Sequence, residues 1–169
     1  TVSTTATGTF ASKNVGTRTA TFVYTLADGT NGGLADNYIL ANTTDDAVIS
    51  AKALTISGLT SANKVYDGTT SATVNGTATF VNETAGSGTT SDGKSYTGDT
   101  VSLTGTAIGT FNDKDVADAT TVSFSGLSLT GADATNYTLT PHSTASHTIS
   151  AKALTISGTT ANDKIYDGT

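Results

Sequence analysis

Asp113, Asp115 and Asp118 lie in one short acidic stretch, NDKDVAD, and have the alternating spacing of carboxylates that Ca²⁺-binding loops use. Other features favour a solvated acidic loop. The corresponding stretch earlier in the chain reads SKNVGT and has no carboxylate, and Lys114 lies inside the cluster. The Gly and distal Glu of an EF-hand loop are also missing. The pair Asp45–Asp46 is a second candidate. We predict no metal site at either place.

Groups for acid–base or nucleophilic catalysis are sparse. His142 and His147 are the only histidines, Glu83 is the only glutamate, and Cys is absent. Glu83 lies in the polar, glycine-rich stretch 82–93, which we expect to be a mobile loop. Paired carboxylates need a cleft and shifted pKa values for acid–base catalysis, and the sequence indicates neither. We therefore predict no catalytic residue, no cofactor and no enzymatic activity.

Tyr66 and Asp67 form a Tyr-Asp-Gly motif that recurs at 166–168. Asp-Gly is a tight-turn dipeptide, because Gly accepts a positive φ. We expect Tyr66 to pack against a sheet just before the turn. A ligand-binding role for Tyr66 and Asp67 is the alternative, and recurrence of the motif in each unit favours the role in the fold.

The chain repeats itself at an offset of about 100 residues. The segment ISAKALTISG occurs at 49–58 and again, unchanged, at 149–158. KVYDGT at 64–69 returns as KIYDGT at 164–169. A fixed period of this length is typical of whole domains in tandem, and not of solenoid units of about 20–50 residues.

The repeat divides the chain into three parts. Residues 1–51 match the C-terminal half of one repeat, 52–151 form one complete repeat, and 152–169 match the N-terminal start of the next. Met is absent and the chain begins at Thr1. We therefore expect a window from a longer repetitive protein, or a processed product of one.

Composition is typical of an exported β-protein. Hydrophobic residues make up 36% of the chain and charged residues 13%, with a net charge of −6 and a pI of about 4.5. This charge would repel a nucleic-acid backbone. No apolar run approaches the roughly 20 residues that span a bilayer. We predict neither nucleic-acid binding nor a membrane span.

Alternating apolar and polar residues predict short strands at 19–26, 94–103, 121–129 and 136–140. Turn dipeptides such as Asn-Gly and Asp-Gly separate them. No segment of helical length carries apolar residues at helical spacing. Short strands with frequent turns in a unit of about 100 residues favour an antiparallel β-sandwich.

Tyr137 follows Asp133 at the start of a late predicted strand, which resembles the tyrosine corner of immunoglobulin-like domains. In that motif the phenol bonds back to upstream backbone. Tyr38, after Asp36, would be its counterpart in the first unit, although the spacing differs. The alternative is an ordinary half-buried strand tyrosine. The fold class we predict is therefore all-β, with tandem immunoglobulin-like sandwich repeats.

The apolar face changes within the segment 48–57. Ile49 and Ala51 share one parity, whereas Leu54 and Ile56 share the other. Successive side chains of a strand face opposite ways, so a change of parity moves the apolar residues to the other face. Either the strand contains a bulge, or it leaves one domain core and enters the next near Lys52. The second interpretation predicts stiffly held neighbouring domains, because the crossing contains no Gly or Pro.

The strings AKALTISG, NKVYDGTT, GTF and NYTL, in that order, resemble the YDG domain. The resemblance covers nearly the whole chain. With its MBG-type relatives, this family occurs in tandem in very large bacterial surface proteins similar to filamentous-haemagglutinin-like adhesins. The resemblance implies an extracellular location at the bacterial cell surface and a structural or adhesive role. It supplies no agreed ligand and no catalytic residues.

Surface adhesins sometimes contain isopeptide crosslinks between Lys and Asn or Asp. Lys52, Lys64, Lys94 and Asn63 are available for such a bond. The carboxylate that would catalyse it is not evident from the sequence, which leaves this chemistry open.

Two functions remain. The first is an adhesin stalk or filament body, whose partners are neighbouring repeats of the same chain and, through self-association, fibres. The second is a binding module with Thr-rich strand faces for carbohydrate, a host surface or ice. Thr-X-Thr tracts occur, but they do not recur in the regular register that ice binding needs. We favour the structural role.

Overall fold

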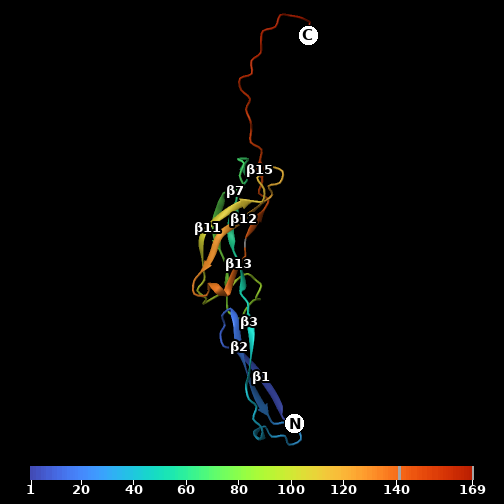
Figure 1. Ribbon diagram of the computed structural model, residues 1–169, viewed down its shortest axis with the longest axis vertical. Helices are drawn as coiled ribbons and strands as arrows, with labels where there is room; N and C mark the ends of the chain where they lie inside the picture. Colours follow the sequence, from blue (N-terminus) through green and yellow to red (C-terminus); the bar gives the residue numbers. More distant parts are fainter. Residues whose placement is uncertain (141, 169) are drawn as a thin grey trace.

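The computed structural model describes residues 1–140 and 142–168 and is elongated, with the two chain ends at opposite ends of its long axis (Figure 1). In the described part, regular structure consists of β-strands and two single-turn 3₁₀ helices, η1 (Ala35–Asn37) and η2 (Ala134–Asn136). The predicted all-β fold is thus confirmed. Its basis is the β-branched and aromatic content of the strands, interrupted by Gly, Asn and Asp at turns.

The N-terminal part is a single antiparallel sheet of β1 (Ser3–Phe10), β2 (Gly16–Ala27) and β3 (Thr43–Ile49), in the order β1-β2-β3. Ala20 is its only buried residue among those described. Val48 is 69% exposed. This sheet therefore has no core of its own.

The central part holds the core and begins at the fourth strand. Its strands are β4 (Lys52–Thr55), β5 (Ser57–Ser61), β6 (Lys64–Val65), β7 (Ser71–Ala72), β8 (Val74–Thr79), β9 (Asn82–Glu83), β10 (Ser95–Tyr96), β11 (Ser102–Phe111), β12 (Thr121–Thr130), β13 (Tyr137–Thr140), β14 (Ser143–Ala145) and β15 (Ile149–Ser150). Antiparallel pairing gives a four-stranded sheet, β14-β12-β11-β7, and the pair β5-β8.

Three pairings in the central part are parallel: β13 with β4, β15 with β6, and β10 with β9. The expectation of a purely antiparallel arrangement is thus wrong for these strands. Parallel neighbours need a long crossover rather than a tight hairpin. In the pairs β4–β13 and β6–β15 the crossover consists of most of the central part. The end of the central part therefore returns beside its beginning.

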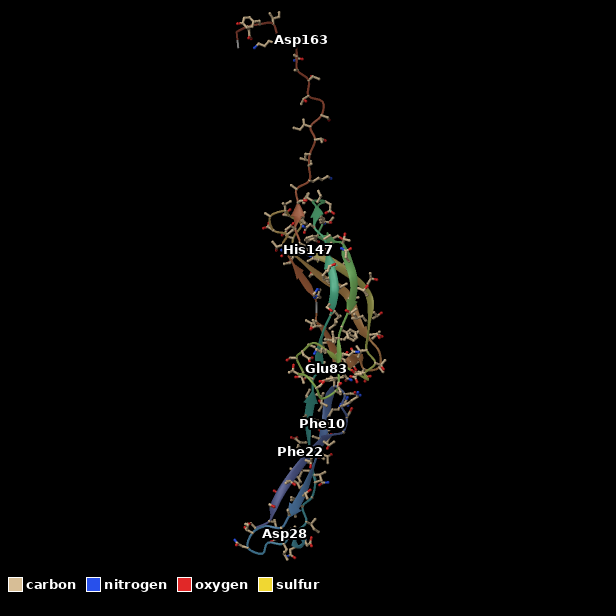
Figure 2. All side chains as sticks on the ribbon, turned by 180° about the vertical axis from the view of Figure 1, so that it is seen from behind. Phe10, Phe22, Asp28, Glu83, His147 and Asp163 are labelled. Atoms are coloured by element: carbon tan, nitrogen blue, oxygen red, sulfur yellow. The ribbon has the colours of Figure 1, made fainter. Side chains whose placement is uncertain are left out.

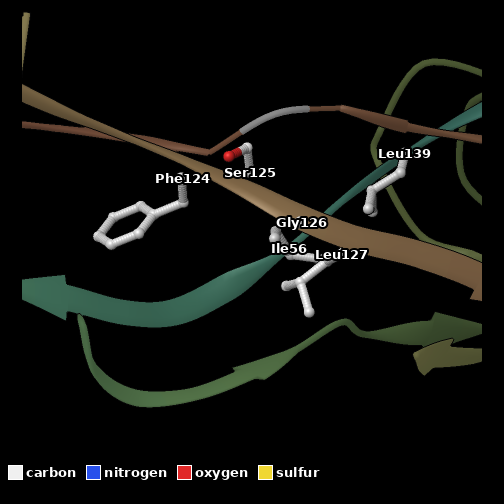
Figure 3. A pocket seen from close by; sticks show the side chains of 6 residues that line it. All are labelled: Ile56, Phe124, Ser125, Gly126, Leu127 and Leu139. Atoms are coloured by element: carbon white, nitrogen blue, oxygen red, sulfur yellow. The ribbon is translucent and has the colours of Figure 1, made fainter. Parts of the chain in front are cut away.

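The core lies between strands from both halves of the central part. Its buried residues are Ile56, Leu59, Phe111, Ala119, Val122, Phe124 and Ile149. A small apolar cavity of about 230 Å³ adjoins it, and Figure 3 shows its lining: Ile56, Phe124, Ser125, Gly126, Leu127 and Leu139. The register of β11 and β12 shifts beside this cavity. Gly126 has a φ of 81° there, and a Cβ would collide with the carbonyl oxygen of Thr106, so only Gly suits the bulge.

The chain changes sheets between β3 and β4. Ile49, the last residue of β3, is opposite Gly16 of β2 in the N-terminal sheet. Leu54 of β4 is opposite Leu139 of β13 and is fully buried in the central part. Only two residues, 50 and 51, separate the two strands. The change of parity in the sequence therefore coincides with a change of pairing partner.

Residues 151–168 extend away from the central part without forming a strand, as Figure 2 shows at Asp163. Leu154 and Ile156 are 89% and 87% exposed. Their counterparts Leu54 and Ile56, in the same ten-residue sequence, are 0% and 3% exposed. Leu54 lies in β4 and pairs with β13, whereas residues 151–168 pair with no strand among the described residues.

Candidate functional site

A buried lysine lies beside two carboxylates at the junction of the N-terminal sheet and the central part. The Lys52 Nζ donates to Glu83 Oε1 at 2.5 Å and to Asp92 Oδ1 at 3.0 Å. The side chains of Lys52 and Glu83 are 7% and 8% exposed, and that of Asp92 is 18% exposed. The ammonium also lies 4.2 Å from the centre of the Tyr96 ring, which is a cation–π distance. We call Lys52, Glu83, Asp92 and Tyr96 the lysine pocket.

Several elements position this pocket. Lys52 begins β4 and pairs with Tyr137, while Glu83 and Tyr96 are opposite each other in the parallel pair β9-β10. Asp92 is held by backbone: its Oδ1 accepts from the Lys94 N–H at 3.1 Å, and its Oδ2 accepts from the Thr89 N–H at 3.3 Å. These bonds fix the orientation of the Asp92 carboxylate toward the amine.

A glycine allows the two carboxylates to approach each other. A Cβ at Gly88 would collide with Glu83 Oε2 and would lie 2.6 Å from Asp92 Oδ2. Both oxygens therefore face the same small space over the Gly88 backbone. Figure 2 shows Glu83 at this junction, above Phe10 of β1.

The surroundings of Lys52 and of Asp92 favour the ionised form of each. Burial disfavours the Lys52 ammonium, but hydrogen bonds to Glu83 and Asp92 outweigh it, so the pKa of Lys52 is raised. Burial likewise works against ionisation of Asp92, but the bonds from Lys52 and the Lys94 N–H prevail, and the pKa of Asp92 is lowered. The resting pocket is an ion-paired network.

Tyr137 links this pocket to a neighbouring charge. Its hydroxyl donates to Asp99 Oδ2 at 2.8 Å and accepts from the Tyr96 N–H at 2.9 Å. Burial is the main reason that the pKa of Tyr137 is raised. The salt bridge from Lys13, at 2.8 Å, is the main reason that the pKa of Asp99 is lowered.

The tyrosine-corner prediction needs a correction. The Tyr137 phenol does bond to upstream backbone, but its partner is the N–H of Tyr96 in β10, 41 residues away, and not a local group. Asp133 accepts instead from the Thr100 N–H at 2.9 Å. The counterpart Tyr38 is 59% exposed.

The loop between β1 and β2 braces the junction. Lys13 bonds Asp99 as described, the Val15 N–H donates to Asn136 Oδ1 at 2.9 Å, and Asn136 Nδ2 donates to Asn14 Oδ1 at 3.1 Å. A cleft of about 730 Å³ lies between the two parts and is lined in part by Phe10, Tyr96 and Tyr137. The N-terminal sheet and the central part are thus joined by side-chain bonds as well as by the chain.

The acidic stretch does not gather its carboxylates. Asp113 Oδ1 accepts from the Asp115 N–H at 2.9 Å, and Asp115 Oδ1 pairs with Lys114 at 2.7 Å. The Asp118 carbonyl accepts from Asn112 Nδ2 at 2.8 Å. Within residues 1–140 and 142–168, no group of three or more His, Cys, Asp or Glu side chains converges as metal ligands would.

The second acidic candidate, Asp45–Asp46, lies on the exposed strand β3. Asp46 Oδ1 accepts from the Thr19 hydroxyl at 2.7 Å across the sheet. Asp45 Oδ1 accepts from the N–H of its neighbour at 2.9 Å. Each carboxylate therefore has a local partner.

The Tyr-Asp-Gly motif forms the turn after β6. Asp67 Oδ1 accepts from Lys64 Nζ at 2.8 Å and from the Thr69 N–H at 2.9 Å. These bonds, with Lys64 first, lower the pKa of Asp67 to about 2. Tyr66 packs against the edge of the core cluster. The two histidines lie elsewhere: His142 stacks on Phe124 at 5.8 Å, and His147 lies just before β15.

Sequence reasoning missed the lysine pocket because Glu83 was assigned to a mobile loop. One signal was present. Lys52 shares the parity of Leu54 and Ile56, which placed it on the buried face, and a buried ammonium requires an anionic partner. Which carboxylate would supply that partner depends on pairing between distant strands, and the local pattern contains no information on it.

Comparison with known proteins gives one family. A family model described as the YDG domain matches residues 50–145, more than half of the chain. No curated protein and no solved structure matches. No helix in the described residues is long and apolar enough to cross a membrane. The matched region begins just before the lysine pocket and contains all of it, together with the core strands from β4 to β14. The chain therefore belongs to the YDG domain family.

Proposed function

We propose that this chain is a structural tandem-repeat segment of an extracellular bacterial surface protein, forming part of an adhesin stalk or filament body. Its neighbours in that role are further repeats of the same long chain. The proposal rests first on membership of the YDG family and on the repeat at about 100 residues.

The observation that carries the proposal is that the same ten-residue sequence occurs in two different environments. The copy at 49–58 pairs on both sides of residue 51 and buries Leu54, whereas the copy at 149–158 leaves Leu154 exposed. Residues 152–155 repeat the sequence of β4 but form no strand, and this is accounted for when a following unit supplies their pairing partner. The next unit would bury Leu154 as the central part buries Leu54.

Contacts at the junction restrict hinging between the N-terminal sheet and the central part. The chain passes from β3 into β4 through only two residues, and the loop containing Lys13 and Asn14 bonds to Asp99 and Asn136 across the boundary. Few backbone dihedrals are left free between the units. A stalk that holds a distal part away from a surface needs restricted hinging of this kind.

We also propose that each complete unit is an immunoglobulin-like sandwich. The support is the core between the four-stranded sheet and the remaining strands, and the two-stranded pairs that close its ends. In this arrangement the parallel pairs β4–β13 and β6–β15 join the beginning of one unit to its end. The chain then continues into the next unit.

An extended chain tests the tandem proposal. Residues 1–169 are to be lengthened by a further copy of 70–150, and hydrogen exchange compared between the two lengths. We expect the amides of 152–155 to become as protected as those of 52–55. Amides that exchange as fast in the longer chain as in the shorter one would refute the repeat arrangement.

A second function, carbohydrate or surface binding by a β-sandwich module, is favoured by the junction cleft. This cleft, of about 730 Å³, presents Tyr96 and Phe10 beside polar groups, a combination that suits a sugar face. Titration of the chain with a panel of glycans, observed by NMR at the junction residues, separates the functions. Saturable shifts at Tyr96 and Asp99 would favour binding, and unchanged spectra would favour the stalk.

A further inference from the structure

The lysine pocket places an amine beside a carboxyl group, at a site from which water is largely excluded. Lys52 Nζ lies 3.0 Å from Asp92 Oδ1 and 2.5 Å from Glu83 Oε1, in side chains that are at most 18% exposed. The chain contains other Lys–Asp contacts, but in those of Lys13, Lys64 and Lys114 at least one of the two side chains is half exposed or more. The Lys52 site is the buried one among the ion pairs of the described residues.

We propose that Lys52 and Asp92 form an intramolecular isopeptide bond, with Glu83 as the proton carrier. The Lys52 Nζ attacks the Asp92 carboxyl carbon, a C–N bond forms, and one C–O bond breaks. Two hydrogens of the ammonium move to the departing oxygen, which leaves as water, and the amide nitrogen keeps the third. Glu83 accepts and releases each proton and ends in its starting state. The reaction needs no oxidant, reductant or second substrate.

The two carboxylates have different surroundings, which assigns their roles. Both Asp92 oxygens accept backbone N–H groups, from Lys94 at 3.1 Å and Thr89 at 3.3 Å. Such donors stabilise the negative charge that develops on a carboxyl oxygen when a nucleophile adds to its carbon. Asp92 is therefore the electrophile.

Glu83 has the position of a relay. One of its oxygens contacts the Lys52 amine, and the other lies with Asp92 Oδ2 over the Gly88 backbone. A proton taken from the amine is thus delivered to the oxygen that departs. The strand pair β9-β10 keeps Glu83 opposite Tyr96, whose ring covers the amine.

The held contact between the amine and the carboxyl group makes the reaction accessible. The resting ammonium–carboxylate pair and the reactive amine–carboxylic acid pair hold the same number of protons, so proton transfer within the pocket converts one into the other. Burial opposes the charged pair, and the hydrogen bonds of the pocket keep that pair as the resting state. Because the Lys52 amine and the Asp92 carboxyl group are already in contact, their reaction is intramolecular and needs no bimolecular encounter.

The bond would tie the strand that enters the central part to the loop that covers it. Lys52 lies immediately after the crossing from β3, and Asp92 belongs to the glycine-rich loop between β9 and β10. Pulling along the chain at Lys52 would then load a covalent link and not only the hydrogen bonds of β4. This inference stands on the pocket geometry and does not depend on the proposed surface location.

Intact-mass spectrometry of the purified, folded chain tests the proposal. We expect the chain to weigh one water molecule less than its sequence, with stoichiometric conversion after prolonged incubation. Tandem spectra should show a branched peptide that joins Lys52 to Asp92. Lys152, in the same AKALT sequence but exposed, is the internal control and should occur only in linear peptides.

Substitutions separate the roles and exclude a competing reaction. Lys52→Arg keeps the charge and should restore the full sequence mass, and Glu83→Gln should slow the loss of water at least tenfold in a chain that still folds. Asp92→Asn should reach the same product by losing ammonia. A folded wild-type chain of unchanged mass would overturn the proposal. So would a loss of water that persists in Lys52→Arg, since cyclisation at Asp92-Gly93 would then account for it.

Discussion

Leu54→Ala and Leu154→Ala form a matched pair in which the same ten-residue sequence is changed in two environments. Leu54 is fully buried and opposite Leu139 of β13, whereas Leu154 is 89% exposed. Truncating a buried leucine to alanine costs about 2–5 kcal/mol, through lost burial and the cavity that remains. Truncating an exposed one costs less than about 0.5 kcal/mol. We therefore expect Leu54→Ala to destabilise the central part by about 3 kcal/mol and Leu154→Ala to leave it unchanged.

Thermal unfolding followed by far-ultraviolet circular dichroism measures the difference. For a domain of this size, about 1 kcal/mol corresponds to roughly 4–8 °C in Tm, so Leu54→Ala should lower the Tm by at least about 12 °C. Urea unfolding with an unchanged slope would verify that the loss lies in the folded state. Equal effects of the two substitutions would refute the assignment of β4 to the core of the central part.

Three further predictions concern the site and its surroundings. Tyr137→Phe removes the hydroxyl that accepts from the Tyr96 N–H and donates to Asp99, and should cost about 1–3 kcal/mol in urea unfolding because a buried donor loses its acceptor; an unchanged midpoint would contradict this role. Asp67 should titrate near its folded pKa of about 2, below its ordinary 3.8, and Lys64→Met should raise that pKa in NMR titration. Because the folded pKa is the lower one, the Asp67 contribution to stability is present above about pH 4 and is lost as the pH falls through the folded value; a Lys64→Met titration identical to wild type would remove Lys64 as the cause. Excess Ca²⁺ and EDTA should give the same Tm to within about 8 °C, which corresponds to roughly 2 kcal/mol, and a larger difference would restore Asp113, Asp115 and Asp118 as ligands.

The local pattern of the sequence predicted some strands and misplaced another. The predicted strand 94–103 is wrong: only β10 (Ser95–Tyr96) and the start of β11 at Ser102 are strand there, and a turn at 97–98 separates them. Alternation over 121–129 and 136–140 corresponds to β12 and β13, because half-buried strands must place apolar residues on every second position. The change of parity after Ala51 marks where the chain changes sheets. Both signals are local, since they depend only on which face of a strand is covered.

Long-range pairing could not be predicted in the same way. Nothing near Lys52 indicates that β4 pairs in parallel with β13, or that Glu83 and Asp92 come to its ammonium from a glycine-rich segment. That segment is polar and rich in turn residues, which is typical of a mobile loop, yet backbone bonds to Asp92 and the approach over Gly88 order it. The chemistry of the pocket therefore follows from tertiary contacts.

Small-angle scattering on polypeptides of two, four and six complete units tests the central claim, that these repeats build a stiff stalk. The two-residue crossing between β3 and β4 and the bonds from Lys13 and Asn14 across the junction leave few free dihedrals between units. We predict that the maximum dimension grows linearly with the number of units. Growth as the square root of that number, which flexible linkers give, would contradict the stalk and leave independent binding modules.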